Sequence, residues 1–501
     1  MDGLVRREKT DASHILPDYI PNWIGGEETS AQEDGVFEKR SPHNGEIMFT
    51  VARSSAADVD RAVMAAKRAQ FSWAQTPPVQ RGNILHKVCN ALEEHQEAMA
   101  RVVARETGKS FREALGETSG AIALGRFFAG EGQRLYGRTT TSGIPNRYSM
   151  TVRQPCGVAA LITAANTPIA NVAWKVFPAL ICGNGVVLKA AEDAPATAWL
   201  FTKIAHESGM YPGALNVIQG LGPEAGAPLV LHPGVDVISF TGSTTTGRWV
   251  GEQAAKRMAK VSLELGGKNP FVVCDDADLA LAVKWACLSA FSNAGQRCAA
   301  GSRIIVFESV YEQFREMFVA ATAKLEVGPS DDDDLGPVIN ERQLKNMLAV
   351  IERAQEQGAR ILIGGGRMTD EAHVRGYYMS PTLVEGATPQ AEISTCELFG
   401  PIANLYQARD FEEALKLAND SPYGLTACIH TRNLDRAIEF VHRVQAGVAV
   451  VNAGTYGSEP HVPFGGLKQS GNGTREPGTE ALDVYTELKT IYLNTDKDDN
   501  V

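Results

Sequence analysis

The feature that most constrains the fold is an alternation, beginning at Pro155, of short apolar runs with longer stretches of helical periodicity. The runs are nearly continuous in β-branched and other hydrophobic residues, as expected for strands that helices cover on both faces. The expected strands are residues 157–163, 185–190, 216–220, 235–240 and 261–265, and the expected helices are 168–180, 194–208, 223–231 and 244–258. The pattern predicts a doubly wound α/β unit with a parallel sheet.

A second alternation predicts a second α/β lobe. Its expected strands are residues 270–274, 303–307 and 361–365, its expected helices lie at about 277–291 and 310–325, and further units continue to about 468. Ahead of both lobes, helical periodicity runs from about Ala57 to Gly108 and is interrupted at Pro77 and Pro78. The fold class is therefore predicted to be α/β with a helical flank.

Two segments, Arg147–Arg153 and Tyr485–Leu493, alternate with a period of two but lack helices to cover them. Alone, such strands would expose unpaired backbone hydrogen-bonding groups. We therefore expect them to pair with each other or with a neighbouring subunit. Residues 495–501, which are mostly polar or charged, are expected to be a disordered tail.

Length and charge exclude several classes of protein. The 501 residues suffice for two or three domains of about 150 residues each. Lys and Arg number 48 against 59 Asp and Glu, so the formal net charge of −11 argues against a nucleic-acid groove. The first twenty residues lack the apolar core of a signal peptide, and no later segment reaches the roughly 20 apolar residues that span a bilayer. We expect a soluble, cytoplasmic protein that binds neither nucleic acid nor membrane.

The cysteines and the acidic run point to no metal or disulfide framework. Eight cysteines are scattered without a CxxC pair, which favours free thiols in a reducing compartment. The run Asp331–Asp334 lies between two prolines, where a solvated turn is the favoured interpretation over a metal site. We expect no bound metal.

Two glycine-rich turns follow expected strands. Gly220–Gly226 nearly matches a dinucleotide fingerprint but has one residue too many, so a structural turn is favoured. Phe240–Gly247 follows a strand and opens a helix, and its hydroxyl and backbone N–H groups are suited to a pyrophosphate. An ordinary helix cap explains the same residues, and both interpretations stay open here.

Cys298 stands in a polar, glycine-containing loop between an expected helix and an expected strand. Most single cysteines are small buried hydrophobes, and this interpretation covers the other seven. Arg297 and nearby backbone amides would favour a thiolate at Cys298, the form that attacks a carbonyl carbon. On this loop alone, both a nucleophile and a structural residue remain open.

Two further polar residues lie at the ends of expected strands. Glu264 ends an apolar strand, where a carboxylate is either a general base with a raised pKa or part of a structural ion pair. Asn166 lies just beyond the carboxyl end of the first strand, where open α/β sheets bind ligands. Its side-chain NH2 would stabilise an oxyanion, although on this stretch alone turn formation beside Pro168 is the favoured interpretation.

Taken together and in order, these segments resemble the aldehyde dehydrogenase superfamily of NAD(P)-dependent enzymes. The resemblance runs from about Asn22 to Leu493. The matching segments are AANTPIANVAWKVFPAL, GNGVVLKAAE, FTGSTTTG, LELGGKNP, FSNAGQRCAAGSR, CELFGP and PFGGLKQSG. So many spaced matches make chance convergence improbable.

The resemblance implies a domain plan and a quaternary structure. Residues 1–136 and 154–264 would form a Rossmann-like NAD-binding domain, and residues 265–468 would form an α/β catalytic domain. Residues 137–153 and 480–494 would form a small β oligomerisation element. Homodimers or homotetramers are expected.

The resemblance also assigns roles to individual residues. Cys298 matches the nucleophile, Glu264 the base, Asn166 the oxyanion donor together with the Cys298 backbone N–H, and Lys175 a position associated with proton relay. The residues that would bind the cofactor are Lys189 and Glu192 at the adenosine ribose, Ser243 at the phosphates with Thr241 and Gly242 in the same turn, Gly222, and Glu397 and Phe399 at the nicotinamide. The phosphates would lie at Ser243 and not at the near-fingerprint around Gly220. Many members carry an aromatic residue where this chain has Ala165, which implies a looser wall of the cofactor cleft.

The reaction implied is oxidation of a small-molecule aldehyde to a carboxylic acid through a thiohemiacetal and a thioester on Cys298. Glu264 favours hydrolysis, because relatives that pass the acyl group to coenzyme A usually lack this glutamate. The alternatives are a coenzyme-A-acylating semialdehyde dehydrogenase and a catalytically inactive protein on the same fold. The presence of Cys298, Glu264 and Asn166 argues against an inactive protein.

Cofactor and substrate preferences follow from a few side chains. A carboxylate at Glu192 would accept hydrogen bonds from a ribose 2′-OH and repel a 2′-phosphate, so NAD is expected over NADP. Thr167, Asn171 and Phe464 are expected to line the substrate pocket. Helix capping explains Thr167 and Asn171 as well.

Overall fold

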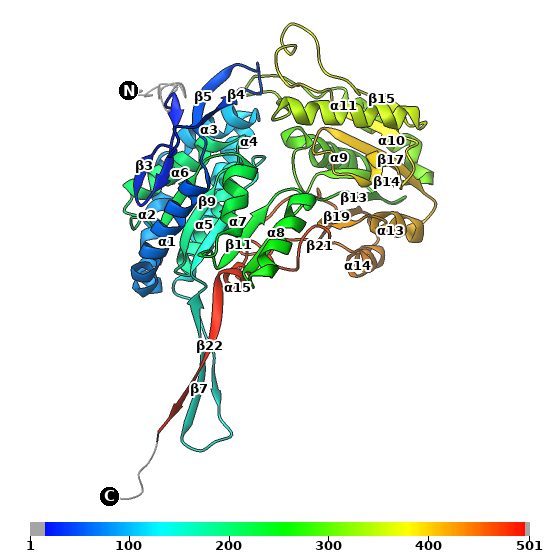
Figure 1. The fold of residues 1–501 in the computed structure, drawn as a ribbon. Helices are drawn as coiled ribbons and strands as arrows, with labels where there is room; N and C mark the ends of the chain where they lie inside the picture. The colour runs from blue at the N-terminus through cyan, green and yellow to red at the C-terminus, as the bar shows by residue number, and fades with distance from the viewer. Residues whose placement is uncertain (1–15, 496–501) are drawn as a thin grey trace, which may run out of the picture.

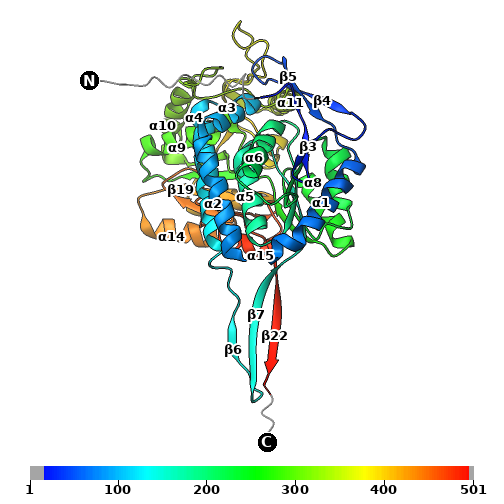
Figure 2. The same ribbon diagram turned by 90° about the vertical axis from the view of Figure 1, so that its left-hand side faces the viewer.

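The computed structural model describes residues 16–495 and consists of two sheet-centred lobes with a slender sheet projecting from them (Figure 1). The projection runs away from the body in both views (Figures 1 and 2). The α/β fold class predicted from the alternation of strands and helices is therefore confirmed.

The first lobe is built on a seven-stranded sheet in the order β12-β11-β8-β9-β10-β2-β3. The five strands from β12 to β10 are parallel, whereas β2 and β3 are added antiparallel. The five parallel strands match the five predicted runs. The strand bounds are β2 Asn22–Ile24, β3 Glu27–Thr29, β8 Val158–Ile162, β9 Gly185–Lys189, β10 Leu215–Ile218, β11 Val237–Thr241 and β12 Lys260–Glu264.

Helices cover both faces of this sheet, which explains why its strands are apolar throughout. In β8, Ala159 and Leu161 belong to one hydrophobic cluster, and Val158 and Ala160 belong to the cluster on the opposite face. Successive strand residues point to opposite faces, so each face has its own core. One face is covered by α5 (Pro168–Ile181) and α6 (Pro195–Glu207), and the other by α1 (Ala56–Gln75), α7 (Ala227–Leu231) and α8 (Thr244–Lys256).

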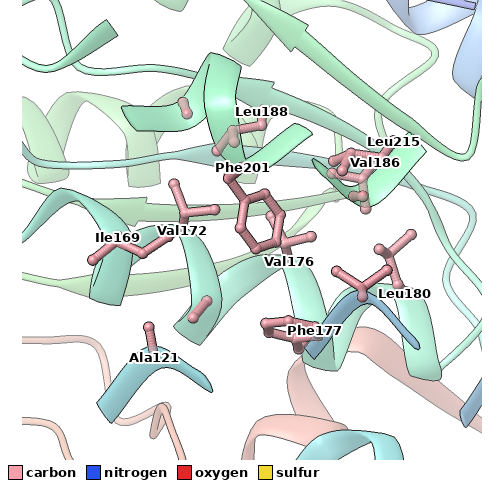
Figure 3. Packing of buried hydrophobic residues seen from close by; sticks show 14 of the residues in the cluster. Ala121, Ile169, Val172, Val176, Phe177, Leu180, Val186, Leu188, Phe201 and Leu215 are labelled. Carbon is pink, nitrogen blue, oxygen red and sulfur yellow. The ribbon is translucent and has the colours of Figure 1, made fainter. Parts of the chain in front are cut away.

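The predicted helical flank, from about Ala57 to Gly108, contains α1, α2 (Pro78–Glu94) and α3 (Gln96–Thr107), and the chain breaks between α1 and α2 at the two predicted prolines. A further layer outside α5 and α6 is formed by α2, α3 and α4 (Phe111–Glu131), the last of which was not predicted from the sequence. Figure 3 shows the packing of side chains that α5 presents every three or four residues: Ile169, Val172, Val176 and Leu180. This spacing is that of one helix face buried against its neighbours.

The predicted helix over 223–231 differs in detail, because its first turn is a π turn, Gly222–Gly226, followed by α7. The three other predicted helices of the first lobe, over 168–180, 194–208 and 244–258, are α5, α6 and α8, and each end lies within two residues of its expected position. Element ends are the least certain feature of any periodicity argument.

The second lobe contains another seven-stranded sheet, in the order β15-β16-β17-β14-β13-β19-β20. Only β15 is antiparallel to its neighbour within this sheet. The strands are β13 Asn269–Val273, β14 Gly301–Phe307, β15 Arg360–Ile363, β16 Thr382–Glu385, β17 Ile402–Ala408, β19 Thr426–His430 and β20 Val448–Val451. The helices of this lobe are α9 Leu279–Phe291, α10 Glu308–Thr322, α11 Glu341–Glu356, α12 Glu392–Thr395, α13 Phe411–Asn419 and α14 Leu434–Arg443. The second predicted lobe is thus confirmed.

The projecting sheet has the order β22-β7-β6 and joins distant parts of the chain. β7 (Arg147–Pro155) pairs antiparallel with β22 (Thr486–Asn494), in a register that places Thr490 opposite Thr151. The predicted pairing of the two period-two segments is therefore confirmed within one chain. The remaining elements are β1 Tyr19–Ile20, β4 Val36–Arg40, β5 Ile47–Ala52, β6 Thr139–Thr141, β18 Tyr423–Gly424, β21 Leu467–Lys468 and α15 Ala481–Tyr485.

Other sequence predictions concern exposed or terminal segments. The acidic run forms a turn in which Asp331 and Asp334 pair with Arg101 and Arg112. Residues 16–495 contain no cluster of three or more His, Cys, Asp or Glu side chains placed to hold a metal ion. Across the same range, no helix combines the length and apolar character that a membrane crossing requires. Of the predicted disordered tail, residues 496–501 lie outside the described part of the chain.

The strand order locates the functional edge of the first sheet. From β8 the chain adds β9 and β10 on one side and then returns to add β11 and β12 on the other. The order therefore reverses between β8 and β11, and open α/β sheets bind ligands in the crevice beyond such a reversal.

Candidate active site

Cys298 lines a cavity of about 750 Å³ that opens near the junction of the two lobes. The side chain is half-buried, and Asn166, Trp174 and Phe464 line the same cavity. The Cys298 sulfur is therefore not sealed in the hydrophobic core, as a purely structural cysteine would be.

A strained turn carries the chain from α9 to Cys298. Asn293 and Ala294 adopt left-handed φ values of 54° and 52°, which cost about 1–3 kcal/mol each in residues other than glycine. Gly295 follows with φ of 68°, and a Cβ there would collide with the Gly400 carbonyl oxygen. Such strain persists only where surrounding contacts enforce it.

The backbone of Cys298 is held from the second sheet. Asn269, at the start of β13, donates from Nδ2 to the carbonyl oxygens of Cys298 (2.7 Å) and Ala300 (2.9 Å). Its Oδ1 accepts from the Thr426 backbone N–H (3.0 Å). Two hydrogen bonds of this buried amide therefore hold the loop, and the third fixes the amide itself to β19.

Asn166 faces the cysteine loop from the end of β8. Its Nδ2 donates to the Gln296 carbonyl oxygen at 2.9 Å, which engages one of the two amide hydrogens. Its backbone carbonyl oxygen accepts from Lys109 Nζ (2.7 Å) and from Asn293 Nδ2 (3.0 Å). Asn166 also forms the turn before Pro168, and it lines the cavity. Both interpretations of this residue from the sequence, as a turn residue and as a residue of the site, are therefore compatible with the structure.

The environment of Cys298 does not favour a thiolate. Burial, together with the carboxylates of Glu397 and Glu264, raises the pKa of the Cys298 thiol to about 12. The Ala299 N–H and Arg297 lower the pKa of the thiol, as predicted, but burial and the two carboxylates raise it by more. The expectation that the loop itself activates the thiol is therefore wrong, and the thiol needs a base to remove its proton.

Glu264 is a buried carboxyl at the end of β12. Among the described residues, neither of its carboxyl oxygens has a hydrogen-bond partner, and no ion pair to it is found. Burial, reinforced by Glu476, raises the pKa of this carboxyl well above its usual value, with Lys175 and Arg475 opposing. The structural ion pair that the sequence left open is thus not the arrangement observed.

Lys175 belongs to a fully buried polar network beside Glu264. Its Nζ donates to Glu476 Oε2 (2.8 Å) and to Ser239 Oγ (2.5 Å). Ser239 and the Tyr485 hydroxyl both donate to Glu476 Oε1, at 2.8 and 3.1 Å. Glu476 was not predicted from the sequence, because it lies in an irregular segment without periodicity.

A second cavity, of about 710 Å³, lies at the strand-order reversal between β8 and β11. Predicted cofactor residues in its lining are Lys189, Glu192, Gly222, Thr241 and Gly242. A Cβ on Gly222 would meet no other atom within 4 Å, so this glycine leaves open space that a larger residue would fill. The volume, the helix N-terminus and the position at the reversal all fit a dinucleotide.

Several features of this second cavity refine the sequence prediction. Lys189 Nζ contacts Glu192 Oε2 at 3.1 Å, and Ala165 lies in the wall as expected. Trp249 and Arg342 also line it and were not predicted. Ser243 is not a lining residue: its Oγ caps α8 by accepting from the Thr246 N–H at 3.3 Å, so the helix-cap interpretation describes this side chain.

Glu397 and Phe399 lie on the cysteine side, around a small hollow that they share with Gly267 and Arg297. Gly267 donates its N–H to Glu397 Oε1 at 3.0 Å, and burial raises the pKa of Glu397 to about 7. A Cβ on Gly266 would collide with the Glu397 carboxylate. The glycine pair after β12 therefore lets the chain pass close to this carboxylate.

Comparison with known proteins decides the family. The model of the aldehyde dehydrogenase family matches residues 29–491. The chain belongs to this family. The α-ketoglutaric semialdehyde dehydrogenase of Bacillus subtilis is 38% identical to this chain, and the match covers 94% of this chain and 97% of that protein. The α-ketoglutarate semialdehyde dehydrogenase of Haloferax volcanii is 39% identical, and the match covers 95% of this chain and 99% of that protein. Among solved structures, betaine aldehyde dehydrogenase of Staphylococcus aureus in complex with NAD+ is 33% identical, with a TM-score of 0.94 and 97% of both chains covered.

This family member is an oxidoreductase that converts aldehydes to carboxylic acids with a nicotinamide dinucleotide. The second cavity fits that cofactor, and the first contains the cysteine. The hydrolytic aldehyde dehydrogenase predicted from the sequence is thus supported over the alternative functions.

The predicted substrate residues of this aldehyde dehydrogenase divide into two groups. Thr167 and Phe464 line the cavity beside Cys298, and Phe464 packs edge-on against Trp174 at 5.4 Å between ring centroids. Asn171 is not a lining residue. It is buried, and its Nδ2 donates to the backbone carbonyl and hydroxyl oxygens of Thr167 at 3.0 Å and to Asn166 Oδ1 at 3.5 Å, so it holds the turn at the start of α5 instead of lining the pocket.

Proposed function

We propose that this aldehyde dehydrogenase uses NAD+ and releases a free acid, with Cys298 as nucleophile, Asn166 as oxyanion donor and Glu264 as general base. The observation that carries the proposal is the meeting of Cys298 and Asn166 at one cavity, near a buried carboxyl without partners. Burying a carboxyl without partners is energetically unfavourable, and carboxyls with such raised pKa values are typical of functional sites.

The steps follow from these side chains. The Cys298 thiol loses its proton to water in the open cavity, and its sulfur attacks the aldehyde carbon to give a thiohemiacetal anion, whose oxygen is stabilised by the free amide hydrogen of Asn166 and by the Cys298 N–H. When bound, the nicotinamide accepts the hydride that leaves the former aldehyde carbon. Glu264 then takes a proton from the water that attacks the thioester, and the acid departs. The buried Lys175–Glu476 pair beside Glu264 is proposed to take over that proton.

Asn166→Ala is predicted to lower kcat about 10²- to 10³-fold, because one preorganised donor to an oxyanion contributes about 3–4 kcal/mol. NADH production from a reactive aldehyde measures the change. The matched control is Asn346→Ala, which removes an exposed amide on α11 that does not line the cavity. A kcat within about twofold of the parent enzyme would mean that Asn166 serves only the turn.

NAD is the proposed cofactor because Glu192 lines the dinucleotide cavity with a carboxylate. Glu192→Ser is expected to reduce the preference for NAD over NADP about tenfold, since a repulsive charge at the 2′ position is removed. The ratio of the two kcat/KM values measures this preference. Glu207→Ser, an exposed change at the end of α6, is the control. An unchanged ratio in Glu192→Ser would refute the assignment.

The domain roles and assembly are also proposals. Residues 1–136 and 154–264 are proposed to bind the cofactor, residues 265–468 to carry the catalytic cysteine, and residues 137–153 and 480–494 to join subunits in a homodimer or homotetramer. Exposed apolar side chains on the projecting sheet, Tyr148, Leu488 and Tyr492, support this role. All eight cysteines are free thiols, which supports a cytoplasmic location.

A further inference from the structure

Glu117, on α4, binds the first turn of α5 directly and is linked to Asn166 through Lys109. Its Oε1 accepts from the backbone N–H groups of Ile169 (3.1 Å) and Ala170 (3.2 Å), which lie in the first turn of α5 and have no partner within that helix. Its Oε2 accepts from Lys109 Nζ at 2.5 Å, and both side chains are buried, at 7% and 1% exposure. The same Lys109 ammonium donates to the backbone carbonyl oxygen of Asn166 at 2.7 Å. The orientation of Asn166 is therefore tied to α4.

Glu113, one helical turn earlier on α4, binds the cysteine loop. Its Oε1 accepts from the Asn293 N–H at 2.9 Å, at the first of the two left-handed residues that precede Cys298. Asn293 in turn donates from Nδ2 to the Asn166 carbonyl oxygen at 3.0 Å. The two glutamates thus reach the two loops that converge on the cavity, and these loops also contact each other.

α4 is suited to be a common support for both loops. It packs against α5 in the body of the first lobe (Figure 2), and residues four apart lie on the same helix face. Both oxygens of Glu117 are occupied by protein donors, so this carboxylate is not free to bind an aldehyde. A misplacement of about 1 Å of a catalytic group costs about 100-fold in rate.

We infer that Glu117 and Glu113 are positioning residues that hold the oxyanion asparagine and the nucleophilic cysteine in a fixed relation, with Lys109 linking Glu117 to Asn166. The inference rests on the proposed function, because it assigns the effect of Glu117 to the oxyanion role of Asn166. Glu117 lines the same cavity as Cys298, but protein donors hold both of its oxygens, so we assign its effect to Asn166.

A double-mutant cycle tests this inference. Glu117→Ala is expected to lower kcat about 10- to 100-fold while leaving KM for the nicotinamide cofactor unchanged. In an Asn166→Ala background, the same substitution is expected to change kcat by less than about twofold, because the group it positions is gone. The inference would be overturned if the reductions in kcat caused by the two single substitutions multiplied in the double variant. It would also be overturned if kcat of Glu117→Ala lay within about twofold of the parental value.

Two variants separate positioning from folding. Glu131→Ala removes another buried carboxylate from α4, one that pairs with Arg134 outside the cavity, and is expected to keep the parental kcat. Glu117→Gln retains an acceptor for the α5 N–H groups and is expected to regain at least about fivefold over Glu117→Ala. If Glu117→Ala does not fold, the cycle is measured with Glu117→Gln.

The outcomes also distinguish this inference from the proposed function. If Asn166→Ala alone retains the parental kcat, the oxyanion assignment fails and this inference fails with it. If Asn166→Ala is impaired and Glu117→Ala multiplies that impairment, only the positioning role of Glu117 is refuted.

Discussion

Cys298→Ser is expected to reduce aldehyde oxidation by about 10⁴-fold or more while leaving NADH binding unchanged. The substitution keeps the size and position of the side chain but replaces a strong nucleophile by a hydroxyl that holds its proton far more tightly. Cys298 lines the substrate cavity and not the dinucleotide cavity, so the two properties separate. Steady-state NADH production measures the first property, and quenching or enhancement of NADH fluorescence on titration measures the second.

Cys287→Ser is the matched control for this prediction. Cys287 lines the same cavity from α9 and is also half-buried, yet it has none of the loop contacts that hold Cys298. Its replacement is expected to change kcat by less than about twofold. A Cys298→Ser enzyme with a tenth or more of the parental rate would exclude a covalent mechanism at this residue.

The sequence predicted the sheets well because burial on both faces leaves a strong local signal. Residues 158–162 are apolar at every position, and alternate residues of this run belong to the two hydrophobic clusters on opposite faces of the sheet. The pairing of β7 with β22 was also predictable, since two uncovered strands with a period of two each need a partner. Local patterns thus determined most of the fold that positions the site.

The electrostatics of the site were not predictable in the same way. The pKa of Cys298 is governed by burial and by Glu397 and Glu264, which are distant in sequence and reach the sulfur only through the tertiary fold. Arg297 is adjacent in sequence and therefore dominated the prediction, although its effect is the smaller one. Local charge is a poor guide to the pKa of a group whose surroundings come from several elements.

The supports of the catalytic residues were missed for a related reason. Glu117, Asn269 and Glu476 give no local signal of function, because each resembles an ordinary polar residue on a helix, a strand or a loop. Their importance lies in hydrogen bonds across long sequence separations, to Ile169, to Cys298 and to Lys175. Tertiary contacts alone reveal such residues.

Glu264→Gln is expected to leave hydride transfer in place and to slow thioester hydrolysis about 10²- to 10⁴-fold, the range that a positioned general base contributes. Glutamine matches glutamate in shape but accepts no proton from the attacking water. Because acylation precedes this step, mixing enzyme, NAD+ and aldehyde should give a burst of about one NADH per active site and then slow turnover. Stopped-flow absorbance measures both phases, and loss of the burst would assign Glu264 to an earlier step.

The pH dependence gives a second test of the same residue. Burial raises the pKa of Glu264 well above its usual value, so the basic form becomes populated only as pH rises toward that pKa. The hydrolysis rate of the parent enzyme should therefore increase with pH, and that increase should be absent from Glu264→Gln, which has no group to titrate there. Glu385→Gln is the matched control, because Glu385 also ends a parallel strand, β16, but is paired with Arg360 and accepts from Tyr311. It should keep the parental pH profile, and equal loss of the pH dependence in both variants would refute the base assignment.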